Sequence, residues 1–125
     1  MFGEGTFGKC IRGSYKGIEV AVKVFKGKLS WKIVHKEANI LLKIPSHLGI
    51  PMFIGLFTVD FPYLLVTKRH QYSGKSTTYS NMVKHYQKAQ NNQLLCLLCT
   101  LLDAIMHIHN SGILHNDIKG NNVLV

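Results

Sequence analysis

The sequence predicts an α+β fold in which short strands form a sheet with one helix, and a helical segment follows. Residues 9–12 and 19–25 have strand character, whereas the apolar residues of 31–44 and 93–110 recur at helical spacing. The polar stretch 70–92 lies between these two parts of the 125-residue chain. We therefore expect a sheet-rich first part and a helical second part.

The strands are predicted from alternation and from the turn residues that bound them. β-Branched valines alternate with other residues along 19–25, which is typical of a strand. Glycines bound the preceding turn, which we place over 13–17. Two further strands are expected near 53–59 and 63–67, on either side of a turn at 60–62 that contains proline.

The first helix is predicted from Trp31 to about Ile44, with Ser30 as its N-cap. Its apolar face carries Glu37 in the middle, three or four residues from Ile33, Ile40 and Leu41. A carboxylate in this position needs a cationic partner if the face is buried. The residues predicted to form the face are Ile33, Ile40, Leu41 and Ile44.

The second part of the chain is predicted to be helical. A short helix is expected around 79–90, and a longer one over 93–110 ends near Gly112. The longer helix is apolar over more than one face, so we expect an exposed apolar patch that a protein partner covers. Its periodic apolar residues are Leu94, Leu97, Leu98, Leu101, Ile105 and Ile108.

Composition narrows the class of protein. Hydrophobic residues make up 46% of the chain, which is ordinary for a globular domain. The formal net charge is +9, but the basic residues are scattered, so we do not expect nucleic acid as a partner. A small basic nucleic-acid-binding protein remains an alternative, and it predicts affinity that falls steeply with salt.

The cysteines and the apolar segments indicate a cytoplasmic protein. The three cysteines, Cys10, Cys96 and Cys99, are an odd number, and the first residues do not resemble a secretory signal. The longest apolar stretch, 94–108, is interrupted by polar residues, so we expect no membrane span. Cys96 and Cys99 lie on a helix without a second cysteine pair, so neither a zinc site nor a redox site is favoured.

Gly3, Gly5 and Gly8 form a G-x-G-x-x-G pattern. Glycines allow backbone amides to approach a phosphate closely. A dinucleotide-binding turn should follow a strand and open a helix, whereas strand residues follow this one. The pattern therefore favours a hairpin lying over phosphates, although glycine-rich turns are common.

Lys23 lies inside an apolar strand, on the same face as Ala21 and Phe25. An unpaired ammonium is costly to bury, so Lys23 must reach either an anion or solvent. Glu37 is the only acidic residue between Glu19 and Asp60. A Lys23–Glu37 pair would satisfy both residues; the alternative is a helix turned so that Glu37 faces water.

Asp117, Lys119 and Asn122 lie between two short apolar runs near the end of the chain. Asp117 could accept the proton of a substrate hydroxyl, and Lys119 could neutralise a moving phosphoryl group. Asn122 could offer an amide oxygen to Mg²⁺. We expect His115 to be a core histidine that positions this loop.

In this order, the motifs resemble the first half of a eukaryotic protein kinase domain, and the resemblance covers nearly the whole chain. It implies a protein-kinase-like fold, with a five-stranded antiparallel N-lobe and one helix. The first helix and the catalytic loop of a truncated helical C-lobe follow. The parts would be 1–69 (N-lobe and start of the hinge), 70–92 (linker) and 93–125 (start of the C-lobe).

The resemblance also implies ATP and Mg²⁺ as cofactors and a protein substrate. Lys23 would hold the α- and β-phosphates and pair with Glu37. Asp117 would be the catalytic base, Lys119 the phosphate-neutralising residue and Asn122 a Mg²⁺ ligand. The residues that would surround the nucleotide are Gly3, Gly5, Gly8, Cys10, Ala21, Thr67 at the back of the adenine pocket, and the hinge Lys68–His70.

The family's serine/threonine enzymes carry lysine at the position of Lys119, and the sequence around Asp117 is similar to the tyrosine-kinase-like branch. Asn116 stands where the family has arginine, so we expect no dependence on activation-loop phosphorylation. The Asp-Phe-Gly segment is absent from the 125 residues, so we expect this chain alone to be inactive. The alternative is a non-catalytic, pseudokinase-like fragment that binds nucleotide or protein.

Overall fold

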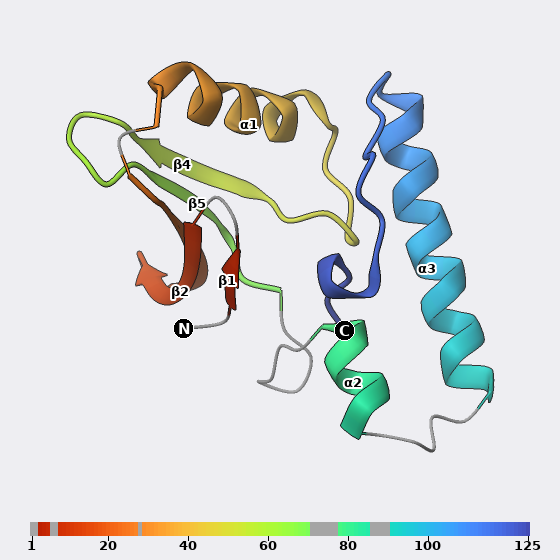
Figure 1. Ribbon diagram of the computed structural model, residues 1–125. Coiled ribbons are helices and arrows are strands. Elements are labelled where there is room, and N and C mark those ends of the chain that lie inside the picture. The colour runs from red at the N-terminus through yellow and green to blue at the C-terminus, as the bar shows by residue number, and fades with distance from the viewer. Residues whose placement is uncertain (1–2, 6–7, 28, 71–77, 86–90) are drawn as a thin grey trace. The chain divides into compact units, whose positions relative to one another are not determined.

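The computed structural model describes residues 3–5, 8–27, 29–70, 78–85 and 91–125 (Figure 1). The chain divides into two compact units, which we call the sheet unit and the helical unit. The sheet unit comprises Met1–Ser46 and Pro51–Arg69. The helical unit comprises His47–Ile50 and His70–Val125.

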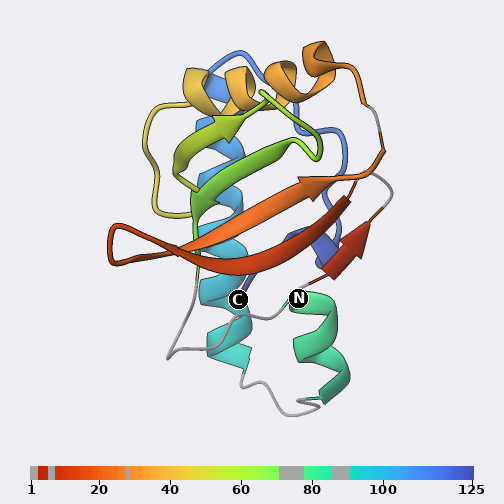
Figure 2. The same cartoon turned by 90° about the vertical axis from the view of Figure 1, so that its left-hand side faces the viewer.

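The sheet unit contains an antiparallel sheet with strand order β1-β2-β3-β5-β4 (Figure 2). β3 therefore lies in the middle, with β2 on one side and β5 on the other. The predicted α+β class with an antiparallel sheet is confirmed. The strands are β1 Gly3–Gly5, β2 Gly8–Tyr15, β3 Ile18–Phe25, β4 Phe53–Phe57 and β5 Leu64–Lys68.

The turn between β2 and β3 is shorter than predicted. β2 continues to Tyr15, and Gly13 lies within it opposite Val20, so the turn predicted over 13–17 is wrong at its first three positions. Only Lys16 and Gly17 form the turn, with φ of 48° and 78°. Two residues with positive φ match the twist of paired strands, so they can close this hairpin.

β4 and β5 also differ from their predicted ends. β4 ends at Phe57, because Val59 is 81% exposed and lies outside the ladder. β5 begins at Leu64 and continues to Lys68, whose amide donates to the carbonyl of Met52 at 2.8 Å. The two strands stay in register through a bulge between Phe53 and Gly55.

Helix α1, Trp31–Lys43, packs on one face of the sheet (Figure 1). The predicted N-cap is confirmed, because the Ser30 hydroxyl accepts from the Lys32 amide. The predicted buried face is wrong in part: Ile33 and Ile40 are 50% and 36% exposed, whereas Val34 is fully buried. The buried core residues are Phe25, Val34, Ala38 and Leu65, with Leu29, Leu41, Phe53, Leu56 and Tyr63 packed around them.

The helical unit contains helices α2, Tyr79–His85, and α3, Asn91–Asn110, and a short 3₁₀ helix η1, Gly120–Asn122. The helix predicted over 79–90 is present to His85; its remainder lies outside the described residues, as does most of the predicted linker. α3 ends where Gly112, with φ of 76°, donates its amide to the His109 carbonyl. Gly112 therefore supplies the predicted stop.

α3 carries an exposed apolar patch, as predicted. Its buried side includes Ala104, which the periodicity did not single out, whereas Leu98, one of the periodic residues, is 43% exposed. α3 is long and apolar enough to cross a membrane by length and composition alone, a test that core helices also pass. The patch consists of Leu95, Leu98, Leu102 and Met106.

The segment His47–Ile50 belongs to the helical unit although it precedes β4 in the chain. The His47 Nε2 lies 2.9 Å from an Asp103 carboxylate oxygen on α3, and the Gly49 amide donates to His47 Nδ1 at 3.0 Å. A neutral ring with its proton on Nε2 satisfies both bonds. A Cβ on Gly49 would lie 2.9 Å from the Ala104 Cβ, so this segment also packs closely on α3.

Candidate active site

Lys23 lies in the middle of β3, and the register places Cys10 of β2 and Leu65 of β5 beside it. Leu65 is buried in the core under α1, so Lys23 points to the face of the sheet that the helix covers. Its ammonium nitrogen lies 4.8 Å from the centre of the Phe25 ring. The core therefore fixes where this side chain can reach.

The predicted Lys23–Glu37 pair is present. The Lys23 Nζ donates to both carboxylate oxygens of Glu37, at 2.6 and 2.8 Å. The side chains remain 32% and 39% exposed, so both charges keep contact with water. Glu37 follows Val34 by three residues and precedes Ala38, so the packing of α1 aims it at the sheet although it lies at the edge of the buried stripe.

The predicted glycine hairpin is present as the β1–β2 pair. Gly3 lies opposite Cys10, and Gly5 lies opposite Gly8. A Cβ on Gly8 would lie 2.2 Å from the carbonyl oxygen of Val24, so no other residue fits there without moving backbone. Gly8 is therefore required by strand packing, whatever ligand the hairpin binds.

Cys10 lies on β2 beside Lys23 and is a free, half-buried cysteine. Burial raises the pKa of its thiol, and the nearby Lys23 ammonium opposes the shift. A thiol with a raised pKa behaves as a small apolar side chain. Cys10 therefore adds no charge beside Lys23.

Ala21 and Thr67 lie opposite each other on β3 and β5, two residues along β3 from Lys23. The backbone that follows Thr67 is already bonded to the sheet: the Lys68 amide donates to Met52, and the Arg69 amide donates to the Glu19 carbonyl at 3.0 Å. A ligand at this edge must therefore use groups other than these two amides.

The second group of candidate residues lies in the helical unit, in the loop that ends at η1. The Asn122 side-chain amide donates to both the backbone carbonyl and the Oδ2 of Asp117, each at 2.9 Å. The Lys119 ammonium lies 3.3 Å from Asp117 Oδ1. Hydrogen bonds from Lys119 and then Asn122 lower the pKa of Asp117, so its carboxylate is ionised at neutral pH.

The residues before Asp117 set its direction. His115 Nδ1 accepts from the Asp117 amide at 3.2 Å, so His115 does position the loop. It is exposed, however, so the prediction of a core histidine is wrong; the bond needs only a local turn. Asn116 adopts a φ of 61°, a conformation that asparagine tolerates better than most side chains.

The start of α2 supports this loop, a contact that the sequence did not reveal. The Tyr79 amide donates to the Val123 carbonyl at 2.8 Å, and Thr78 bridges to Leu124 (Figure 1). A Cβ on Gly120 would lie 2.5 Å from the Ser80 hydroxyl, so the loop and α2 touch. The only local signal was Gly120 itself, between two candidate residues.

The oxygen atoms of the Asp117 loop suit Mg²⁺ only if a bound molecule supplies further oxygen atoms. Among the described residues no group of three or more His, Cys, Asp or Glu side chains lies together. The loop offers the carboxylate of Asp117 and the Asn122 Oδ1, which is free to bind because the amide nitrogen faces Asp117. Mg²⁺ commonly takes one or two such oxygens together with substrate phosphates.

Comparison with known proteins assigns this arrangement to a family. The model of a family described as protein tyrosine and serine/threonine kinase matches residues 1–125. The chain belongs to this kinase family. The order of the motifs, from the glycine hairpin to the Asp117 loop, is thus that of a protein kinase domain.

Individual relatives agree with this assignment. The kinase chain is 31% identical over 127 residues to the probable serine/threonine-protein kinase gdt4 of Dictyostelium discoideum; the match covers 98% of this chain and 7% of that protein. It is 27% identical to the probable serine/threonine-protein kinase drkA of the same organism, over 98% of this chain and 20% of that protein. It is 28% identical to kinase suppressor of Ras A of Caenorhabditis elegans, over 100% of this chain and 16% of that protein. The chain therefore spans a fifth or less of each of these relatives.

Proposed function

We propose that this chain binds MgATP and serves the transfer of the γ-phosphoryl group to a serine or threonine hydroxyl of a protein. The observation that carries the proposal is the Asp117 loop, where Lys119 and Asn122 hold an ionised carboxylate. The Lys23–Glu37 pair supports it, because it aims an ammonium group from the middle of the sheet. Family membership and the names of the relatives favour the same chemistry.

In this proposal Lys23 contacts the α- and β-phosphates, and Glu37 holds the ammonium group in position between turnovers. Both carboxylate oxygens of Glu37 accept from Lys23, so the ammonium has a fixed direction before a nucleotide binds. An ion pair of this kind lowers the entropy lost when the phosphates bind. The glycine hairpin covers the phosphates with its backbone.

Asp117 orients the substrate hydroxyl and accepts its proton as the bond to phosphorus forms. Its lowered pKa makes it a weak base in the ground state. Proton transfer therefore comes late, when the hydroxyl oxygen donates electron density to phosphorus and its proton becomes more acidic. Lys119 moves its ammonium from Asp117 toward the transferring phosphoryl group. Asn122 would hold Mg²⁺ through Oδ1, and bound Mg²⁺ would neutralise charge on the phosphate oxygens.

The substrate class rests on Lys119. Within the family a lysine at this position resembles serine/threonine enzymes, and the relatives gdt4 and drkA carry that specificity in their names. An exposed Lys119, 56% accessible, is free to leave Asp117 when a phosphoryl group arrives. We therefore assign serine or threonine rather than tyrosine as the acceptor.

Nucleotide affinity measured with a fluorescent ATP analogue and Mg²⁺ tests the proposal. Lys23→Met should weaken binding by about tenfold or more, because a charged partner of the phosphates is lost. Asp117→Asn should leave the affinity of this chain within about twofold. In a kinase domain that contains this chain and an Asp-Phe-Gly segment, it should reduce phosphoryl transfer to a serine-containing protein by roughly 10²–10⁴-fold. Lys36→Met, which removes an exposed lysine from α1, is the matched control and should change neither.

Two outcomes would contradict parts of the proposal. A wild-type chain whose melting temperature does not rise with MgATP binds no nucleotide, since a ligand of the folded state must stabilise it. In a kinase domain that contains this chain and an Asp-Phe-Gly segment, binding with no transfer that depends on Asp117 would support the non-catalytic alternative, in which nucleotide or protein is held without chemistry.

A further inference from the structure

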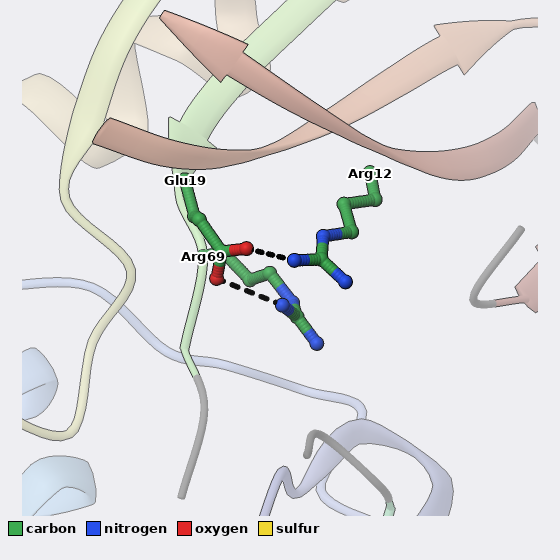
Figure 3. A network of polar contacts seen from close by, with 3 residues as sticks. All are labelled: Arg12, Glu19 and Arg69. Carbon is green, nitrogen blue, oxygen red and sulfur yellow. Dashed lines mark hydrogen bonds and ion pairs between the residues drawn. The ribbon is translucent and has the colours of Figure 1, made fainter. Parts of the chain in front are cut away.

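Glu19, the second residue of β3, joins three segments of the sheet unit through its carboxylate (Figure 3). One oxygen accepts from the Arg12 guanidinium on β2, and the other accepts from Arg69 Nη1 at 2.9 Å, just after β5. The Glu19 carbonyl also accepts from the Arg69 amide at 3.0 Å. Arg69 is therefore tied to Glu19 twice, once through its backbone and once through its side chain.

The two arginines differ in burial. The Arg69 side chain is 6% exposed, whereas the Arg12 side chain is 59% exposed and Glu19 is 34% exposed. A charge-assisted hydrogen bond is stronger where water is excluded, and a buried guanidinium that loses its carboxylate is costly. The Glu19–Arg69 bond should therefore restrain its segment, while the Arg12–Glu19 bond should contribute little.

The restrained segment is the backbone that follows β5. The Lys68 amide is bonded to Met52 and the Arg69 amide to Glu19, so the direction of the chain at these two residues is set by neighbouring strands. Because the peptide unit is planar, these bonds also restrict the directions of the backbone carbonyl groups on either side of them. Displacement of the Arg69 side chain would release one of the bonds that hold this direction.

Glu19 lies near the start of β3, whereas Lys23, the candidate for phosphate binding, lies farther along the same strand. The two residues are four positions apart, which is about 13 Å along a strand that rises roughly 3.3 Å per residue. In the proposed site the base lies beside Thr67 and the residues that follow it, and the register places Thr67 opposite Ala21 and Lys68 opposite Val20, next to Glu19. The Glu19 carboxylate with its two arginines and the Lys23–Glu37 pair should thus act on different ends of the same ligand.

We infer that Glu19 is a positioning residue for the adenine end of the nucleotide, acting through Arg69 on the backbone after β5. The inference rests on the proposed nucleotide site and assigns separate residues to its two ends. Loss of the Glu19 carboxylate should weaken recognition of the base and leave recognition of the phosphates intact.

Displacement of a fluorescent ATP analogue by ATP, by adenosine and by tripolyphosphate separates the two ends. Glu19→Gln keeps the shape of the side chain and removes its charge. It should weaken ATP and adenosine by about tenfold and leave tripolyphosphate within about twofold. Lys23→Met should show the reverse pattern, with tripolyphosphate affected and adenosine unchanged.

Three further variants test whether the effect of Glu19→Gln on the base depends on Arg69. Arg69→Met should reproduce the Glu19→Gln pattern, and the effects of the two changes should not add, because the Glu19–Arg69 bond is common to both. Arg12→Met removes the exposed partner and should change each ligand by less than about twofold. Asp60→Asn, which removes an exposed carboxylate from the β4–β5 turn, is the matched control.

The outcomes distinguish the inference from the function it rests on. If the wild type binds all three ligands and Glu19→Gln lowers their affinities equally or not at all, Glu19 has a general structural role or no role in binding. The inference is then wrong. If the wild type binds none of them, the proposed nucleotide site is wrong, and the inference falls with it. If Glu19→Gln does not fold, the same comparison of adenosine with tripolyphosphate in Arg69→Met decides the question.

Discussion

The Lys23–Glu37 pair of the sheet unit and the Asp117 group of the helical unit are held in different ways. Lys23 stands on a central strand, and Glu37 stands on a helix whose inner face is buried beside Leu65. Asp117 is 62% exposed and depends on hydrogen bonds and an ion pair with residues within five positions along the chain. The first group is thus positioned by a core, and the second by a local turn with the support of α2.

This difference predicts how far from a substitution its structural effect extends. A change in the core under α1 should move Glu37 and Lys23 without touching either residue, because packed interiors transmit strain. A change in the Asp117 loop should act on its immediate neighbours, because the loop is exposed and its bonds are short-range. The following variants test the contrast, in order of expected effect.

The largest effect is expected for Leu65→Ala. Leu65 is 3% exposed and lies beside Lys23 in the sheet, so its truncation should lower the free energy of unfolding by about 2–5 kcal/mol. Leu42→Ala, on α1 but 61% exposed, is the control and should cost no more than about 0.5 kcal/mol. Urea titration measures both; equal losses would mean that the core does not support the Lys23–Glu37 pair as described.

An intermediate effect is expected for Gly8→Ala. The new methyl group would meet the backbone oxygen of Val24, which cannot move without opening the β2–β3 ladder, so we expect a loss of about 1–3 kcal/mol. Gly120→Ala in the helical unit would meet the Ser80 hydroxyl, a side chain that can rotate, so its cost should be smaller. Gly55→Ala, with nothing within 4 Å of the new atom, is the control.

The melting temperatures of these three glycine variants test the contrast between the sheet unit and the helical unit. If Gly120→Ala costs as much as Gly8→Ala, the helical-unit loop is packed as tightly as the sheet, and the contrast between the two groups is lost. If Gly8→Ala is as mild as Gly55→Ala, the β2–β3 ladder accommodates the methyl group.

The smallest effect is a pH dependence that comes from Asp117. Its pKa is lowered in the folded chain, first by Lys119 and then by Asn122, so it contributes stability above its unfolded value near 4. That contribution is lost as the pH falls through the lower, folded value, where the carboxylate becomes protonated. Because the group is exposed, salt should weaken the effect.

Melting temperatures of the wild type and Asp117→Asn between about pH 6 and pH 3 measure this contribution. The difference between the two proteins should narrow as the pH falls. A difference that is constant over this range would show that Lys119 and Asn122 do not act on an ionised Asp117. Glu19, whose pKa Arg12 and Arg69 also lower, is present in both proteins and cancels from the comparison.

Local patterns in the sequence were sufficient for most elements. The alternation of 19–25, the Ser30 cap and the stop at Gly112 each depend on residues a few positions apart, so β3, α1 and the end of α3 could be predicted. The order of the motifs pointed to the kinase family before any contact was known. The Lys23–Glu37 pair was also predictable, because few acids were available and a buried ammonium needs a partner.

Only the tertiary structure decided which face of α1 is buried and how the candidate groups are supported. Ile33 and Val34 are equally apolar, and their positions around the helix differ by one residue; contact with Leu65 and Phe25 selects Val34. Glu19 and Arg69 are fifty positions apart, and Tyr79 and Val123 are forty-four, so no local pattern could join them. Spacing along the chain reports neighbours on one element, whereas strand pairing and packing bring distant residues together, and the Glu19–Arg69 bond belongs to the second kind.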